Sequence, residues 1–230
     1  MRILLILLII LTSCKNNQDR KSDEKSIETN SDIKNNSKIK IKDSSNFLRI
    51  PYNLKYDYFD SLATKINPNK QYEYWQYARY NQSITGEIKY RILKEGGDLS
   101  KRKKISEKID PIKVLGIFQG GHPSYRCIYA IYIENQKINY IKTEVEFRNF
   151  LGSIDNLEEA ILLARTYGYV VGSEPIVSQY KKTENGFVLH LLKYYEYPPS
   201  KELIEITIHK DGFVKTESLG IFKTGREANE

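Results

Sequence analysis

The sequence has 230 residues, of which 40% are hydrophobic and 28% are charged, and its formal net charge is +7. This composition is enough for the core of one globular domain, and it excludes collagen, a coiled coil, a disulfide-stapled miniprotein and a wholly disordered chain. It also excludes a protein with many membrane spans. The one extended apolar run, residues 3–11, lies at the N-terminus and is too short to cross a bilayer.

The first fourteen residues predict a secretory signal. Arg2 supplies a positive charge, residues 3–11 are all apolar, and the small residues Thr12 and Ser13 precede Cys14. A nine-residue helix rises only about 14 Å, roughly half of the ~30 Å hydrocarbon core, so this run is too short for a mature membrane span. The alternative is a buried strand or core helix.

The run Leu11-Thr12-Ser13-Cys14 resembles the lipobox of bacterial lipoproteins. The resemblance implies cleavage between Ser13 and Cys14 and a diacylglyceryl group on the Cys14 thiol. Two or more acyl chains anchor a protein stably, so we expect a lipid-anchored protein of the cell envelope. The resemblance further implies the outer membrane if the host is Gram-negative, because Lys15 and not aspartate follows the cysteine.

Residues 15–45 predict a disordered tether. Only four of them are apolar, all isoleucine, whereas eight are positively and six negatively charged. Such a segment buries too little surface to offset the entropy lost on ordering, and its 31 residues would span about 30 Å. Residues 46–230 then form the folded part, which we expect to be a single α+β domain with a mainly antiparallel sheet and two or three short helices.

The predicted elements follow in chain order. Apolar spacing favours a helix at residues 56–66 and strands at residues 84–93 and 112–118. The spacing in residues 72–80 fits both a helix and a strand, so this segment stays ambiguous. A hairpin is expected around Asn135-Gln136 and a helix at residues 155–167, with a capping box from Asp155 to Glu158 and a stop at Gly168. Alternation predicts a terminal meander at residues 187–194, 203–209 and 213–222. Residues 147–169 and this tail also resemble uncharacterised bacterial lipoproteins in general style, which implies no functional residue.

Aromatic residues crowd the segment 52–80, where aliphatic residues are sparse. Tyrosine and tryptophan often anchor binding interfaces. We therefore predict a recognition surface made of Tyr72, Tyr74, Trp75, Tyr77 and Tyr80. The alternative is a tyrosine-rich layer that covers the sheet with its hydroxyls in water.

A basic run, Lys101-Arg102-Lys103-Lys104, is a second candidate surface. It is suited to anionic lipid headgroups or to the phosphates of lipopolysaccharide. The alternative is a solvated loop. Nucleic acid is not an expected partner of a protein in the envelope.

No catalytic, cofactor or metal constellation stands out in the sequence. Because lipid occupies Cys14, we expect Cys127 to be a buried core residue, the alternative being a nucleophile paired with His122. His190 is expected to pack in a strand and His209 to face solvent, and no cluster has the spacing of metal ligands.

The leading functional hypothesis is a non-enzymatic envelope module that binds a protein or a glycan. A lipid-anchored immunity or inhibitor protein is the first alternative. A small hydrolase is the second, with a site assembled only in three dimensions around His122 or His209 and a carboxylate.

Overall fold

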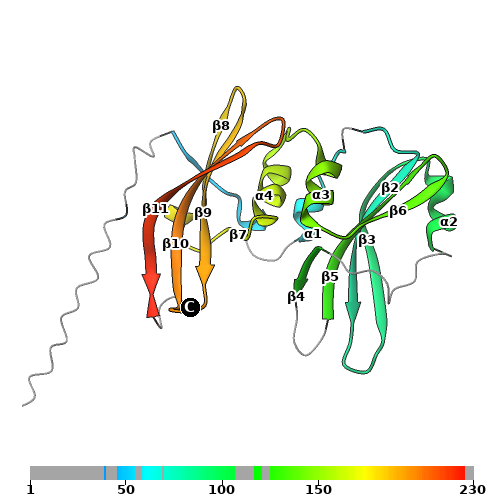
Figure 1. The fold of residues 1–230 in the computed structure, drawn as a ribbon, viewed down its shortest axis with the longest axis horizontal. Helices are drawn as coiled ribbons and strands as arrows, with labels where there is room; N and C mark the ends of the chain where they lie inside the picture. The colour runs from blue at the N-terminus through cyan, green and yellow to red at the C-terminus, as the bar shows by residue number, and fades with distance from the viewer. Residues whose placement is uncertain are drawn as a thin grey trace, which may run out of the picture. The chain divides into compact units, whose positions relative to one another are not determined.

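The computed structural model describes residue 39 and residues 46–54, 59–68, 70–106, 117–120 and 125–225, which belong to one compact unit (Figure 1). They form an α+β fold, as predicted, but with two antiparallel sheets in place of one. The predicted signal peptide, the lipidation site Cys14 and nearly all of the predicted tether lie outside the described residues.

One sheet is built mainly from the end of the chain, and we call it the C-terminal sheet. Its strands run in the order β1-β8-β9-β10-β11, with β7 paired to β9. Their bounds are β1 Leu48–Arg49, β7 Tyr169–Val170, β8 Gln179–Thr183, β9 Gly186–Tyr195, β10 Ser200–His209 and β11 Val214–Thr224. The predicted meander is confirmed: Ile204, Ile206 and Ile208 are buried, while their neighbours Glu205 and Thr207 are partly exposed.

The other sheet, the N-terminal sheet, has the strand order β3-β2-β5-β4, with β6 also paired to β5. Its strands are β2 Tyr74–Gln82, β3 Ile88–Gly97, β4 Ile117–Gly120, β5 Tyr125–Glu134 and β6 Lys137–Ile141. The ambiguous segment is therefore a strand, and β3 begins four residues later than predicted. The predicted β5–β6 hairpin is confirmed, and Asn135 and Gln136 have the positive φ angles, 49° and 60°, of a primed turn.

The helices are short: α1 Phe59–Ala63, α2 Arg102–Ser106, α3 Glu144–Leu151 and α4 Leu157–Arg165, with 3-10 turns at Tyr52–Leu54, Leu99–Lys101 and Pro175–Val177. The predicted helix near residue 160 is α4, but its cap is Asn156 and not Asp155, since the Asn156 side chain accepts from the Glu159 amide. Helix α3 was not predicted, although Thr143 and Glu146 form a capping box at its start. No helix in the described ranges has the length and apolarity to cross a membrane.

Helices α1, α3 and α4 lie between the two sheets and share one hydrophobic core with both (Figure 1). The ring of Phe147 in α3 stacks on Tyr77 of β2 at a centroid distance of 5.7 Å, and Phe150 meets Trp75 edge-on at the same distance. A separate cluster, with Tyr74, Cys127 and Ile105 among its members, covers the opposite face of the N-terminal sheet. Strand β2 is therefore buried on both of its faces.

Candidate ligand-binding groove

The predicted aromatic recognition surface is wrong for four of its five residues. Tyr74 and Tyr77 are fully buried, and Tyr80 and Trp75 are 4% and 8% exposed. The physical reason is the position of β2 between β3 and β5, where residues that alternate along the strand reach two different buried clusters. Only Tyr72, which precedes the strand, remains partly exposed.

The hydroxyl of Tyr74 also has a structural partner. It donates to Glu95 Oε2 at 2.7 Å, and the guanidinium of Arg102 binds the same carboxylate. Burial, followed by this bond to Glu95, raises the pKa of Tyr74 well above its usual value. The phenol therefore stays protonated, and its hydroxyl makes its hydrogen bond within the protein rather than to a ligand.

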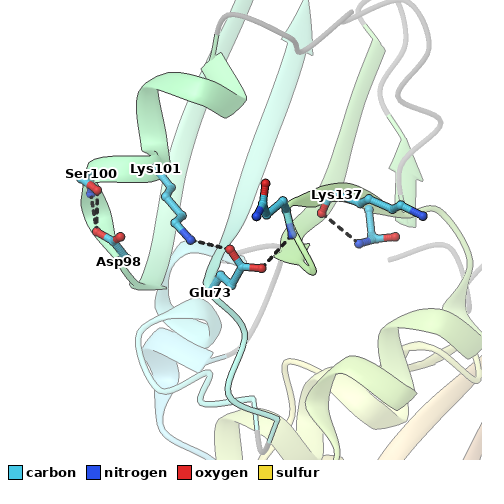
Figure 2. A network of polar contacts seen from close by, with 7 residues as sticks. Glu73, Asp98, Ser100, Lys101 and Lys137 are labelled. Carbon is cyan, nitrogen blue, oxygen red and sulfur yellow. Dashed lines mark hydrogen bonds and ion pairs between the residues drawn. The ribbon is translucent and has the colours of Figure 1, made fainter.

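The basic run is partly neutralised by neighbouring acids. Lys101 forms an ion pair with Glu73, and Arg102 forms one with Glu95. Figure 2 shows Lys101 directed at the Glu73 carboxylate, whose other oxygen accepts from the backbone N–H of Gln136 at 2.8 Å. These two ion pairs connect α2 and the turn before it to Glu73 and Glu95, just before β2 and within β3, and the contact of the basic run with an anionic surface stays a prediction. Lys103 is exposed, and the Lys104 side chain is outside the described set.

The remaining sequence candidates do not assemble a catalytic centre in the part of the chain that the structure describes. Cys127 is 1% exposed, which confirms a core role, whereas His122 lies outside the described residues. His190 is buried as predicted, where Phe47 stacks on its ring and Glu205 Oε2 lies 3.2 Å from its Nε2. The described residues contain no group of three His, Cys, Asp or Glu side chains suited to a metal ion.

An open groove of about 400 Å³ lies at the edge of the core, beside β6 and α3. We call it the rim groove. It is lined by Lys70, Tyr72, Tyr132, Asn139, Tyr140, Ile141, Glu146, Asn149 and Phe150. Its volume falls within the roughly 300–1,000 Å³ of small-molecule sites in proteins.

Local structure explains why these side chains meet. Tyr132 of β5 and Asn139 of β6 are paired across the hairpin, so both side chains lie on the same face of the sheet. On α3, Glu146, Asn149 and Phe150 are spaced at i, i+3 and i+4, which places them on one face of that helix. The hairpin and the helix thus form two sides of the rim groove.

Aromatic rings form the apolar part of the rim groove. The rings of Tyr72 and Tyr132 are 4.4 Å apart between centroids and tilted by 40°. Tyr72 also stacks on Phe150 at 5.6 Å, and Lys70 Nζ lies 5.9 Å from the centroid of the Tyr72 ring. Burial, with lesser effects of Tyr132 and Glu134, raises the pKa of Tyr72 to about 12, so its hydroxyl keeps its proton at neutral pH.

The charged side chains in and beside the rim groove are held by ion pairs or by backbone hydrogen bonds. Lys70 forms an ion pair with Glu134 of β5. Glu146 Oε2 accepts from the backbone N–H groups of Lys142 at 2.7 Å and Thr143 at 3.0 Å. These backbone bonds, that of Lys142 first, hold the pKa of Glu146 below its usual value, so the groove keeps one ionised carboxylate at neutral pH.

Tyr72 is the one residue of this described lining that was predicted from the sequence as part of a binding surface. A usable signal was present for two more residues, because the two-residue turn at Asn135-Gln136 fixes the register that sets Tyr132 opposite Asn139. A signal for α3 was present too, because Thr143 and Glu146 have the capping-box spacing that marks the start of a helix.

Comparison with known proteins adds no assignment, since no family model, no curated protein and no solved structure matches this chain.

Proposed function

We propose that this chain is a lipid-anchored protein of a bacterial cell envelope whose folded part binds a ligand in the rim groove without transforming it. The outer membrane is the proposed location in a Gram-negative host. The observation that carries the binding role is the convergence of Tyr72, Tyr132 and Asn149 on one open groove.

The N-terminal sequence supports the anchor. Residues 3–11 provide an apolar run that follows Arg2, and Leu11-Thr12-Ser13-Cys14 has the lipobox pattern. A diacyl or triacyl cysteine gives durable membrane attachment, unlike a single acyl chain. The polar residues 15–45 would then hold the folded part on the order of 30 Å from the membrane surface.

The chemistry of the lining supports binding rather than catalysis. Among the described residues, the lining contains neither histidine nor cysteine nor serine, and its one carboxylate is Glu146. Because two backbone N–H groups hold that carboxylate in its ionised form, it is a poor general acid at neutral pH. Glycosidic hydrolysis would require a second carboxylate facing the first across the site.

Lipid attachment is tested with the full chain expressed in a bacterial host with labelled fatty acid. We expect the wild-type chain to take up label and to sediment with membranes, and Cys14→Ser to do neither. Ser13→Ala is the matched control, because it retains a small residue beside the cysteine. Labelled, membrane-bound Cys14→Ser would refute the anchor.

The binding role is tested with the full chain in detergent and with fragments of the bacterial envelope that sediment in a centrifuge. Tyr132→Ala should lower the bound fraction, whereas Tyr197→Ala should not, because Tyr197 is 92% exposed and does not line the groove. Equal binding by wild type and Tyr132→Ala would show that the rim groove is not the site.

A further inference from the structure

We infer that the ligand of the rim groove is a neutral oligosaccharide, an inference that rests on the binding role proposed above. A sugar ring presents hydroxyl groups at its edge and C–H groups on its faces. The rim groove combines the two kinds of partner that such a molecule requires.

The first kind of partner is aromatic. Tyr72 and Tyr132 form one wall with their ring centroids 4.4 Å apart, and the buried ring of Phe150, which is 2% exposed, supports Tyr72 at a centroid distance of 5.6 Å. The electron-rich faces of aromatic rings attract the weakly positive C–H groups of a sugar ring. Tyr72 and Tyr132 are only partly exposed, so a ligand held there loses water from its apolar faces.

The second kind of partner is uncharged and polar. Asn139 and Asn149 each carry an amide, which places a donor and an acceptor side by side, as two neighbouring hydroxyls do. Asn149 is exposed, and the Asn139 amide donates to Lys137 O at 3.2 Å while its carbonyl oxygen remains able to accept. The phenol of Tyr72, with its pKa of about 12, adds a donor that does not ionise at physiological pH.

The charges favour a neutral ligand over an anionic one. Lys70, the one cation among the described lining residues, is already paired with Glu134, and the lining also contains the carboxylate of Glu146. Lys142, whose Nζ lies 5.8 Å from the centroid of the Tyr140 ring, is in turn offset by the Glu146 carboxylate, so a phosphate or a nucleotide would meet no net positive charge among these four residues. Ligand recognition here would therefore depend little on salt, in contrast to binding by a cluster of free lysines.

The dimensions favour more than one sugar unit. A second hollow of about 460 Å³ shares Asn149 with the rim groove and is also lined by Arg148 and Tyr167. There the Arg148 guanidinium lies 4.5 Å from the centroid of the Tyr167 ring. Because both linings include Asn149, the two hollows are neighbours, and a further sugar unit attached to one seated in the rim groove would lie near the second.

The test measures binding of the full chain in detergent to three preparations: protein-free peptidoglycan sacculi, protein-free outer-membrane polysaccharide, and envelope proteins freed of glycan. We expect saturable binding to one of the two glycans. Tyr132→Ala should weaken it about tenfold or more and Asn149→Ala about threefold to tenfold, while Tyr197→Ala stays within about twofold of wild type. Asn149 is exposed, so its variant keeps the test valid if Tyr132→Ala fails to fold.

The possible outcomes separate the oligosaccharide inference from the proposed binding role. Groove-dependent binding to either glycan supports the inference and identifies the source of the sugar. Groove-dependent binding to the protein fraction alone overturns the inference but leaves the proposed binding role standing. No groove-dependent binding to any preparation overturns both. A steep loss of glycan binding between about 0.05 and 0.5 M salt would overturn the neutral character of the ligand.

Discussion

Replacing Glu159 with alanine should destabilise the fold strongly, because this carboxylate joins α4 to the chain that follows α1. Glu159 is 1% exposed, its Oε1 accepts from the Asn67 N–H at 2.9 Å, and its Oε2 accepts from the Asp155 N–H at 3.1 Å. Alanine leaves both N–H groups without their acceptor. Each unsatisfied buried group costs about 1–3 kcal/mol, and both are only partly buried, so we expect a loss of about 2–4 kcal/mol in the free energy of unfolding.

The assay is urea unfolding of the full chain, followed by circular dichroism and by the fluorescence of Trp75. The matched control is Glu158→Ala on the same turn of α4, since Glu158 is partly exposed, and its replacement should change the free energy of unfolding by less than about 0.5 kcal/mol. Equal stability of the two variants would refute the structural role of the Glu159 carboxylate.

The same residue predicts a pH dependence with a definite sign. Burial raises the pKa of Glu159 above its usual value, against the opposing effect of the bonds from Asn67 and Asp155. A raised pKa in the folded state means that the folded chain binds the proton more tightly than the unfolded chain. The stability of wild type relative to Glu159→Gln should therefore be greatest below about pH 4 and should fall as the pH rises through the folded-state pKa. If the stability of wild type relative to Glu159→Gln instead increased toward neutral pH, this explanation would be wrong.

Three further predictions test the core. Gly186→Ala should lower the free energy of unfolding by more than about 3 kcal/mol, because the new Cβ would lie 2.0 Å from a backbone oxygen of β10. Gly86→Ala is the control: Gly86 also has a positive φ but has open space around it, so the variant should lose only about 1 kcal/mol. In a Cys14→Ser chain, Cys127 should react with a thiol reagent only after denaturation, and fast labelling of the folded protein would contradict its burial. Tyr74→Phe should cost about 1 kcal/mol through loss of the bond to Glu95 while leaving envelope binding unchanged, and impaired binding would restore Tyr74 to the recognition surface.

The C-terminal sheet was the more predictable part of the fold. Ile204, Ile206 and Ile208 alternate with polar residues, and the resulting strand has one buried face and one partly exposed face. Asp211 and Gly212 lie in the connection that follows, where Gly212 has a positive φ of 83°. The earlier start of β10 at Ser200 and the two register shifts between β10 and β11 were not predicted, because they depend on the pairing of the strands.

Strand β2 was harder to predict because both of its faces are buried, so buried and exposed residues do not alternate along it. Tyr74 and Ala78 face one cluster, and Trp75 and Tyr77 face the other, so no polar side of the strand marks the direction of solvent. An aromatic segment with two buried faces has the same composition as an exposed recognition surface. The number of layers packed on a sheet decides between them, and that number depends on helices elsewhere in the chain.

The cap of α4 shows the limit of local patterns at the level of single residues. Asp155 and Glu158 have the spacing of a capping box, but Asn156 and Glu159 have it too, one residue later. Packing selects the second pair, since it buries Glu159 where its carboxylate meets the Asn67 N–H. That partner is 92 residues away in sequence and leaves no local signal.

The rim groove lies where the inner face of β5 changes from apolar to polar. Ile128 and Ala130 are 2% and 0% exposed, Tyr132 is partly exposed, and the side chain of Glu134 is 33% exposed. Helix α3 has 8 residues and is about 12 Å long, whereas the 10 residues of β5 extend about 33 Å, so this helix is too short to cover the whole strand. Tyrosine suits this boundary because its ring continues the core while its hydroxyl reaches solvent. The same property makes Tyr132 fit a ligand with both C–H faces and hydroxyl groups.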